Sequence, residues 1–280
     1  NHYGYNDFAF DISKYLTCDG TTENVISVKV VHQTPSSRWY SGSGIYRDVE
    51  LIVTDAVHVS RNGTYVTTPN LATEKDGDVT VKVQTDVQND SSAQAAAQIR
   101  TTVLDAEGKA VSEAVTTDVT LAANSTAEKE QTLKVNKPAL WSTENPNLYY
   151  VQTEVLVDGK VKDTYKTTYG FRYINFDVNT GFSLNGKNVK LKGVCMHHDQ
   201  GALGAASERD AVYRQVKKLK EMGCNAIRTS HNTPSSVLLE ACNELGMMVM
   251  DETLAGAFSI AASEVSAKPQ RYCSSFSRLS

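Results

Sequence analysis

The sequence lacks any apolar run close to the roughly 20 residues that a helix needs to cross a bilayer, and it lacks a block of basic residues. Its 28 Lys and Arg stand against 32 Asp and Glu, a net charge of −4. We therefore expect neither a membrane span nor a nucleic-acid partner. The chain begins at Asn1 without Met or an apolar leader, so we expect the numbering to start inside a longer precursor. The compartment, cytoplasmic or exported, stays open.

Cysteine pairs at metal-ligand spacing are also missing. The five cysteines form no Cys-x-x-Cys motif, so the sequence offers no zinc or redox motif of that kind. Cys195, Cys224 and Cys242 lie in the last part of the chain at positions that look buried, where a free thiol behaves as a small hydrophobic side chain. We expect these three to be reduced and structural.

Residues 1–69 carry a β pattern. Residues 24–31 and 48–53 alternate apolar and polar side chains, which predicts two half-buried antiparallel strands. The loop between them is rich in Gly and Ser but carries Arg38 and Trp39, which suit a flat polar ligand such as a sugar ring. The alternative, which composition alone favours, is that the aromatic side chains of this loop only cap the core.

A second β domain is predicted for residues 70–176. About seven short strands within about 100 residues, separated by regular turns, are typical of an immunoglobulin-like sandwich. One of the turns is Asp158-Gly159, a preferred hairpin dipeptide. No catalytic motif stands out here, so we expect a spacer that positions its neighbours.

Residues 177–252 change to alternating strands and helices. Three apolar runs, at residues 190–196, 225–227 and 247–250, are separated by two helical patterns. Strand–helix–strand order with short loops implies parallel pairing. The pattern predicts the first three units of a (β/α)8 barrel.

The two helices have start and stop signals. The first is predicted to follow Ser207 and to end at Gly223. The second is predicted to begin with Thr233 as N-cap and Pro234 at the first helical position, and to end at Gly246.

Polar residues follow each of the three apolar runs. The first run ends in His197-His198-Asp199, the second leads to Arg228 and His231, and the third ends in Asp251-Glu252. In a barrel of this type the active site is built at the carboxyl ends of the strands. The sequence therefore predicts a functional site there.

The pattern fails after Glu252. Residues 253–280 show no sustained period, and three strands cannot close an eight-stranded barrel. We expect a divergent tail in this segment and a chain that is a truncated piece of a larger protein.

Five motifs lie at residues 37–47, 140–149, 169–172, 184–199 and 226–232. Together they resemble glycoside hydrolase family 2, the β-galactosidase, β-glucuronidase and β-mannosidase family, in its bacterial β-galactosidase-like form. They occur in the domain order of that family: a sugar-binding jelly roll, an immunoglobulin-like domain and a TIM barrel. The resemblance implies a multidomain chain with the end of the jelly roll in residues 1–69, the sandwich in 70–176 and the barrel start in 177–252.

The resemblance implies a retaining hydrolase of terminal β-galactosides, with β-glucuronides and β-mannosides as alternatives. Such enzymes use two carboxylates about 5–5.5 Å apart, as acid/base and as nucleophile. In the family these are glutamates after the fourth and seventh barrel strands, which lie beyond the matching region. Asp251 and Glu252 are adjacent on one strand end and should face opposite ways. No catalytic residue is therefore assigned, and the chain alone is expected to be inactive.

By motif position, His197 and His231 resemble family histidines that hydrogen-bond the substrate sugar. Arg228 resembles an arginine that supports the site, and Arg38 is expected to project from the jelly roll toward the same pocket. The predicted ligand is a β-galactoside-type carbohydrate. No cofactor is predicted, although the resemblance allows a Mg or Na ion and a homo-oligomer in the full-length enzyme.

Two alternatives remain from the residues themselves. A metal-dependent hydrolase could use His197, His198, His231 and Asp251 as ligands, but adjacent histidines on a strand face opposite ways, which disfavours it. The other alternative is a non-catalytic carbohydrate-binding or adhesive protein with two β domains and a vestigial barrel.

Overall fold

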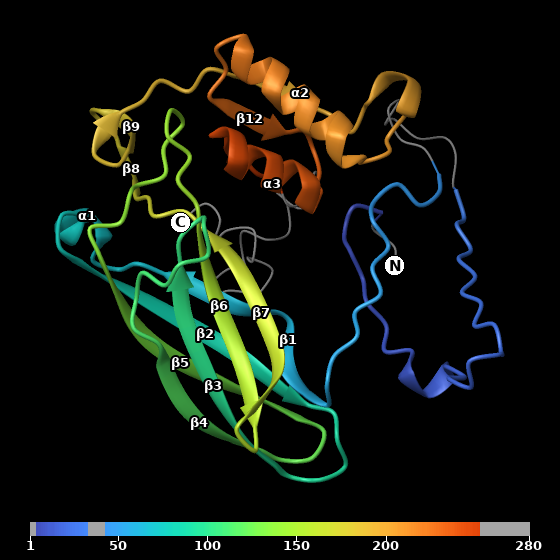
Figure 1. Ribbon diagram of the computed structural model, residues 1–280. Helices are drawn as coiled ribbons and strands as arrows, with labels where there is room; N and C mark the ends of the chain where they lie inside the picture. Colours follow the sequence, from blue (N-terminus) through green and yellow to red (C-terminus); the bar gives the residue numbers. More distant parts are fainter. Residues whose placement is uncertain (1–3, 33–42, 253–280) are drawn as a thin grey trace.

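The computed structural model describes residues 4–32 and 43–252. The described residues form a β-sandwich, a small meander, and a parallel sheet flanked by two helices (Figure 1). Within this part of the chain, no helix has the length and apolarity that crossing a membrane would demand.

The sandwich consists of two antiparallel sheets with strand orders β1-β2-β5 and β4-β3-β6-β7. Its strands are β1 (Val57–Thr67), β2 (Asp78–Asn89), β3 (Ala95–Leu104), β4 (Val115–Leu121), β5 (Ser125–Asn136), β6 (Tyr149–Val157) and β7 (Lys160–Tyr169). A one-turn helix, α1 (Leu71–Glu74), joins β1 to β2. The predicted immunoglobulin-like sandwich is confirmed.

Alternation of side chains explains why these strands pair as they do. In β2 every second residue is fully buried, namely Val79, Val81, Val83, Thr85 and Val87, and the residues that alternate with them are half-buried. The β6–β7 hairpin turns at Asp158 and Gly159, whose φ angles are +51° and +72°. Both central positions of a type I′ turn require positive φ, which Asp and Gly tolerate. The hairpin predicted from this dipeptide is confirmed.

The sandwich begins earlier than its predicted boundary at residue 70. β1 pairs with β2 on both sides of an irregularity between Val59 and Thr64, from Val57 opposite Asn89 to Thr67 opposite Lys82. Residues 57–67 therefore belong to the sandwich, although the sequence placed them in the preceding domain. The alternating pattern shows that a strand is present, but it does not show which sheet the strand joins.

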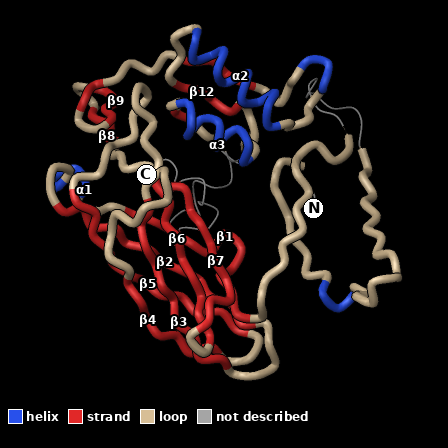
Figure 2. Tube along the Cα trace, viewed as in Figure 1, coloured by secondary structure: helices blue, strands red, loops and turns tan. Residues whose placement is uncertain are grey.

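The prediction of two half-buried antiparallel strands before the sandwich is wrong for the described residues. Residues 4–32 and 43–56 contain no strand, only the short helix η1 (Ser13–Tyr15), and run as coil in Figure 2. Ile26 is 70% exposed and Val53 is 83% exposed. A strand needs a paired neighbour and a covered apolar face, and neither segment has them in the described part of the chain. The jelly-roll assignment therefore stays a prediction.

The barrel part consists of three parallel strands in the order β11-β12-β13. Its elements are β11 (Gly193–Met196), η2 (Gly201–Leu203), α2 (Arg209–Glu221), β12 (Ala226–Thr229), α3 (Ser236–Leu245) and β13 (Met248–Met250). Val216, Ile227 and Cys242 are almost fully buried between the sheet and the two helices. The predicted strand–helix order and parallel pairing are confirmed.

The N-terminus of α3 differs from its prediction. The N-cap is Ser235 rather than Thr233, and its side chain accepts a hydrogen bond from the backbone N–H of Leu238 at 3.3 Å. Either residue type can cap a helix, so the choice depends on the geometry of the preceding loop. The C-terminus is as predicted, because Gly246 ends the helix with a φ of +70°.

One segment joins the barrel part to the sandwich. Trp141 is 1% exposed, and its Nε1 donates to the backbone oxygen of Asn243 in α3 at 2.9 Å. Its own carbonyl accepts from Asn185 Nδ2 at 2.9 Å, beside the small sheet of β8 (Ile174–Asp177), β9 (Gly181–Leu184) and β10 (Lys187–Asn188). Lys220 of α2 also donates to the backbone oxygen of Thr143. These contacts hold the parallel strands in place above the sandwich.

Candidate functional site

The register of the parallel strands sorts their side chains onto two faces. Cys195 of β11 lies opposite Arg228 of β12, and Ile227 of β12 lies opposite Val249 of β13. Ile227 and Val249 pack against the helices. Since side chains alternate along a strand, Cys195 and Arg228 lie on the other face, which corresponds to the interior of a barrel.

His197 and His231 meet beyond the ends of β11 and β12 on the interior face. Their ring centroids are 5.8 Å apart, with the ring planes at 73°. The two histidines come from loops separated by α2, so only the parallel pairing brings them together. The structure thus places side by side two of the four residues predicted for the site.

Arg228, the third predicted residue, lies in the same cluster. Its Nη2 forms an ion pair with Glu252, at the end of β13. Its Nη1 lies 3.3 Å from Cys195 Sγ and 3.4 Å from Ser230 Oγ. Hydrogen bonds from Ser230 and then Arg228 lower the pKa of the Cys195 thiol.

Glu252 also belongs to this cluster, although the sequence pattern marked it only as a polar residue at the end of the third apolar run and gave it no role. Its Oε2 lies 2.9 Å from His231 Nδ1, while its Oε1 contacts Arg228. The signal that could have found it is strand register. Arg228 lies opposite Met250, so Glu252, two residues further along, continues the same face.

Asp251 faces away from this cluster, as predicted for neighbouring residues on a strand. Its Oδ1 lies 3.4 Å from the hydroxyl of buried Thr229, and burial raises the pKa of its carboxyl group. Two carboxylates adjacent in sequence therefore have separate surroundings, and only Glu252 contacts the histidine–arginine cluster.

His198 faces away from His197 and contacts the N-terminal segment. Its ring centroid lies 5.1 Å from that of Tyr5, and its Nε2 lies 3.1 Å from Arg47 Nη2. Burial, and then the charge of Arg47, lower the pKa of His198 to about 4. The segment before the sandwich thus reaches the barrel at this point. Arg38, the fourth predicted site residue, lies outside the described residues.

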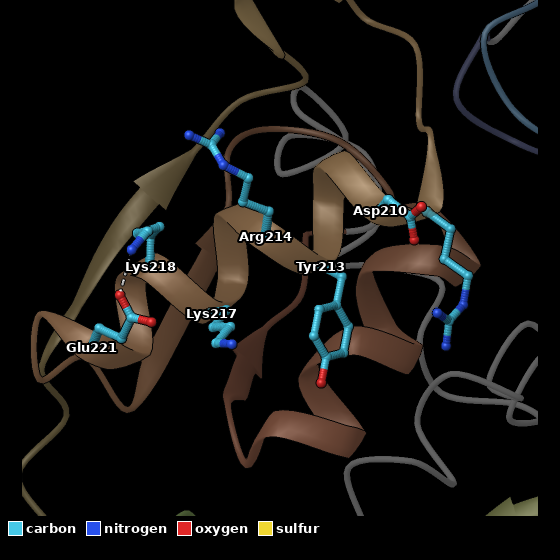
Figure 3. A pocket seen from close by; sticks show the side chains of 7 residues that line it. Asp210, Tyr213, Arg214, Lys217, Lys218 and Glu221 are labelled. Carbon is cyan, nitrogen blue, oxygen red and sulfur yellow. Dashed lines mark hydrogen bonds and ion pairs between the residues drawn. The ribbon is translucent and has the colours of Figure 1, made fainter.

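A hollow of about 460 Å³ runs along the outer side of α2 and does not coincide with this cluster. Figure 3 shows Tyr213 among charged side chains there, with Lys218 paired to Glu221 at 2.7 Å. None of the predicted site residues lines the hollow. Within residues 4–32 and 43–252, no three His, Cys, Asp or Glu side chains gather as a metal-binding group would require.

Comparison with known families covers both folded parts of the chain. The model of the family "Glycosyl hydrolases family 2" matches residues 57–172. The model "Glycosyl hydrolases family 2, TIM barrel domain" matches residues 178–276. The chain belongs to glycosyl hydrolase family 2. The resemblance seen in the five sequence motifs is thereby confirmed, and the barrel-domain match extends beyond Glu252.

Two relatives in the family have similar sequences. The chain is 41% identical over 251 residues to the beta-galactosidase BoGH2A of Bacteroides ovatus. The aligned region covers 89% of this chain and 29% of that protein. The chain is 39% identical over 255 residues to a putative beta-glucuronidase of Formosa agariphila, covering 91% of this chain and 23% of that protein. The chain therefore spans less than a third of the length of these relatives.

A solved structure agrees with the fold. A glycosyl hydrolase family 2 member from Bacteroides cellulosilyticus superimposes with a TM-score of 0.75 at 41% identity. The superposition covers 80% of this chain and 30% of that one. A β-sandwich followed by the start of a TIM barrel is thus the architecture of this family 2 chain.

Proposed function

We propose that the cluster at the ends of β11, β12 and β13 binds the terminal sugar of a β-galactoside. The observation that carries the proposal is the convergence of His197 and His231, with ring centroids 5.8 Å apart. Imidazole nitrogens and a planar guanidinium can serve several sugar hydroxyls at once, which monosaccharide recognition requires. Arg228 supplies the guanidinium, and Arg38 is proposed as a further contact from the N-terminal segment.

The charge of the cluster favours a neutral sugar. Arg228 is paired with Glu252, so these two described side chains together carry no net charge. A glucuronide carboxylate placed here would meet Glu252 as well as Arg228, and like charges at short range repel. Relatives include proteins named beta-galactosidase and proteins named putative beta-glucuronidase. We favour a galactoside, and keep a glucuronide as the alternative substrate.

The whole protein of which this sequence forms part is proposed to be a retaining glycosidase that hydrolyses terminal β-galactosides. Retaining hydrolysis needs two carboxylates about 5–5.5 Å apart. Of the two carboxylates at the end of β13, Glu252 is held by Arg228 and His231, and Asp251 is turned toward Thr229. We propose that the 280-residue chain by itself binds the sugar without cleaving the glycosidic bond.

Titration of the purified chain with galactose, followed by NMR, tests the binding. We expect saturable binding with a dissociation constant in the millimolar range. The variants His197→Ala and His231→Ala should each weaken it about tenfold, or about 1.4 kcal/mol. His32→Ala, a change at an exposed histidine far from the cluster in sequence, is the matched control. No binding at tens of millimolar galactose would refute the proposal.

Two further ligands distinguish the alternatives. Glucuronic acid should bind more weakly than galactose, and the reverse order would favour a glucuronide substrate. A chromogenic β-galactoside should stay intact when incubated with the chain. Hydrolysis of this compound by the chain, and not by an unrelated control protein, would show that the chain contains the catalytic carboxylate pair.

A further inference from the structure

We propose that Glu252 is a positioning residue, which fixes the proton of neutral His231 on Nδ1 and so presents Nε2 as a hydrogen-bond acceptor. The proposal deepens the sugar-binding function and rests on it for the identity of the ligand. The position of the proton itself can be tested without any ligand.

Two contacts of His231 Nδ1 require opposite roles for that nitrogen. Nδ1 lies 2.9 Å from Glu252 Oε2 and 3.4 Å from Arg228 Nη2. An ionised carboxylate only accepts hydrogen bonds, and a guanidinium only donates them. Nδ1 therefore carries a proton if it bonds Glu252, and lacks one if it accepts from Arg228.

The distances decide between the two roles. The contact of 2.9 Å to Glu252 is within the normal range for a hydrogen bond, while 3.4 Å to Arg228 is beyond it. Either contact would involve one charged group, so charge assistance does not separate the two roles and the difference in distance decides. Nδ1 of His231 therefore donates its hydrogen bond to Glu252. Arg228 lies nearby and is not the hydrogen-bond partner of Nδ1.

Arg228 instead orients the carboxylate. It contacts Oε1 of Glu252, and His231 contacts Oε2, so each carboxylate oxygen has its own donor. Only 21% of the Glu252 side chain is exposed, which limits competition from water. The carboxylate is thus held between Arg228 of β12 and His231 of the loop that follows. The tautomer of a functional histidine is commonly set by the hydrogen bond that its other ring nitrogen makes.

The tautomer of His231 decides whether its Nε2 can accept a hydrogen bond from the ligand or donate one to it. A neutral imidazole with its proton on Nδ1 has an acceptor at Nε2. That acceptor takes the O–H of a sugar hydroxyl, whereas the opposite tautomer would present an N–H. Glu252 therefore determines whether His231 accepts or donates in its hydrogen bond with a sugar hydroxyl, although Glu252 itself does not contact the sugar.

Long-range proton–nitrogen NMR spectra of the ¹⁵N-labelled chain, recorded at alkaline pH without sugar, test the tautomer. The chain has 6 histidines, and the His231 signals are identified as those lost in His231→Asn. We expect a protonated Nδ1 and an unprotonated Nε2 in the native chain. In Glu252→Gln the two nitrogen shifts should move toward each other as the tautomers mix, whereas Asp251→Asn, at the neighbouring carboxylate, should leave them unchanged.

Glu252→Asp retains a carboxylate and should partly restore the native shifts, which separates positioning from general loss of structure. Galactose titration of the same variants then shows the consequence, with an expected weakening of about tenfold for Glu252→Gln and none for Asp251→Asn. A native His231 protonated on Nε2, or unchanged shifts in Glu252→Gln, would overturn the proposal. If the native chain does not bind galactose, the proposed ligand is wrong. The nitrogen shifts of His231 would still test the role of Glu252.

Discussion

Arg47 and His198 are 151 positions apart in the chain, and Arg47 Nη2 lies 3.1 Å from His198 Nε2. Arg47 also donates to the backbone oxygens of Tyr5 and Thr233, each at 2.6 Å. Arginine has no acceptor, so Nε2 of His198 must accept and the ring must be neutral. One guanidinium thus ties the N-terminal segment to the loops after β11 and β12, and its hydrogen bond to His198 requires that ring to be unprotonated.

Acid should loosen this connection. The pKa of His198 lies at about 4 in the folded chain, below the ordinary value of 6.5. As the pH falls from 6.5 toward 4, the unfolded chain binds a proton that the folded chain does not, so the free energy of unfolding decreases across this window. Above about pH 6.5 the contribution is fully present.

Urea denaturation at several pH values between about 7 and 4 measures this effect, with His198→Gln as the comparison. Glutamine can accept from Arg47 through its amide oxygen but does not titrate. We expect the urea midpoint of the native chain to fall more steeply with acid than that of the variant. Parallel curves would mean that His198 does not titrate differently in the folded state.

Features encoded within a few residues were predictable. The Asp158-Gly159 turn and the end of α3 at Gly246 depend on local backbone preferences, and both occur as expected. The pairing of His197 with His231 was also accessible, because parallel strands bring their carboxyl ends to one edge.

Features that depend on distant contacts were not predictable. β1 joins the sandwich through its ladder to β2, which no pattern within residues 57–67 specifies. Glu252 enters the cluster because of the register between β12 and β13, and a shift of one residue would have turned it to the other face. The Arg47–His198 contact requires the whole intervening chain to be folded.

The thiols of Cys195 and Cys242 should differ strongly in reactivity. Of the three cysteines predicted to be buried, Cys242 is, whereas Cys195 is exposed and Cys224 is half-buried. Hydrogen bonds from Ser230 and Arg228 lower the pKa of Cys195, while burial raises the pKa of Cys242 to about 12. Since the thiolate is the reactive form, only about one Cys242 thiol in ten thousand would be ionised at about pH 8, and the side chain is also only 1% exposed to a reagent.

Iodoacetamide labelling followed by peptide mass spectrometry measures the two rates separately. We expect Cys195 to be alkylated at least a hundredfold faster than Cys242 in the folded chain. Arg228→Gln should slow the labelling of Cys195, because it removes the guanidinium at 3.3 Å from Sγ. Labelling of Cys195 and Cys242 at equal rates would indicate that the barrel part is not folded as described.

Close approach of β11 to β12 makes Gly193 sensitive to substitution. A Cβ atom at residue 193 would lie 2.2 Å from the backbone oxygen of Ala226, a distance that no relaxed structure permits. Gly193→Ala must therefore push β11 away from β12, and overpacking of this kind typically costs about 1–3 kcal/mol. The same displacement would move Cys195 on the same strand and His197 directly after it.

Gly77→Ala is the matched control, because its Cβ would meet Glu74 only at 3.4 Å, an ordinary contact. We expect Gly77→Ala to change the urea midpoint little, or to raise it by restricting the unfolded chain. Gly193→Ala should lower the midpoint measured by tryptophan fluorescence in a Trp39→Phe background, where the signal comes from Trp141 beside α3, and should also weaken galactose binding. If Gly193→Ala kept both the midpoint and the binding, the parallel pairing of β11 with β12 would be refuted, and with it the approach of His197 to His231.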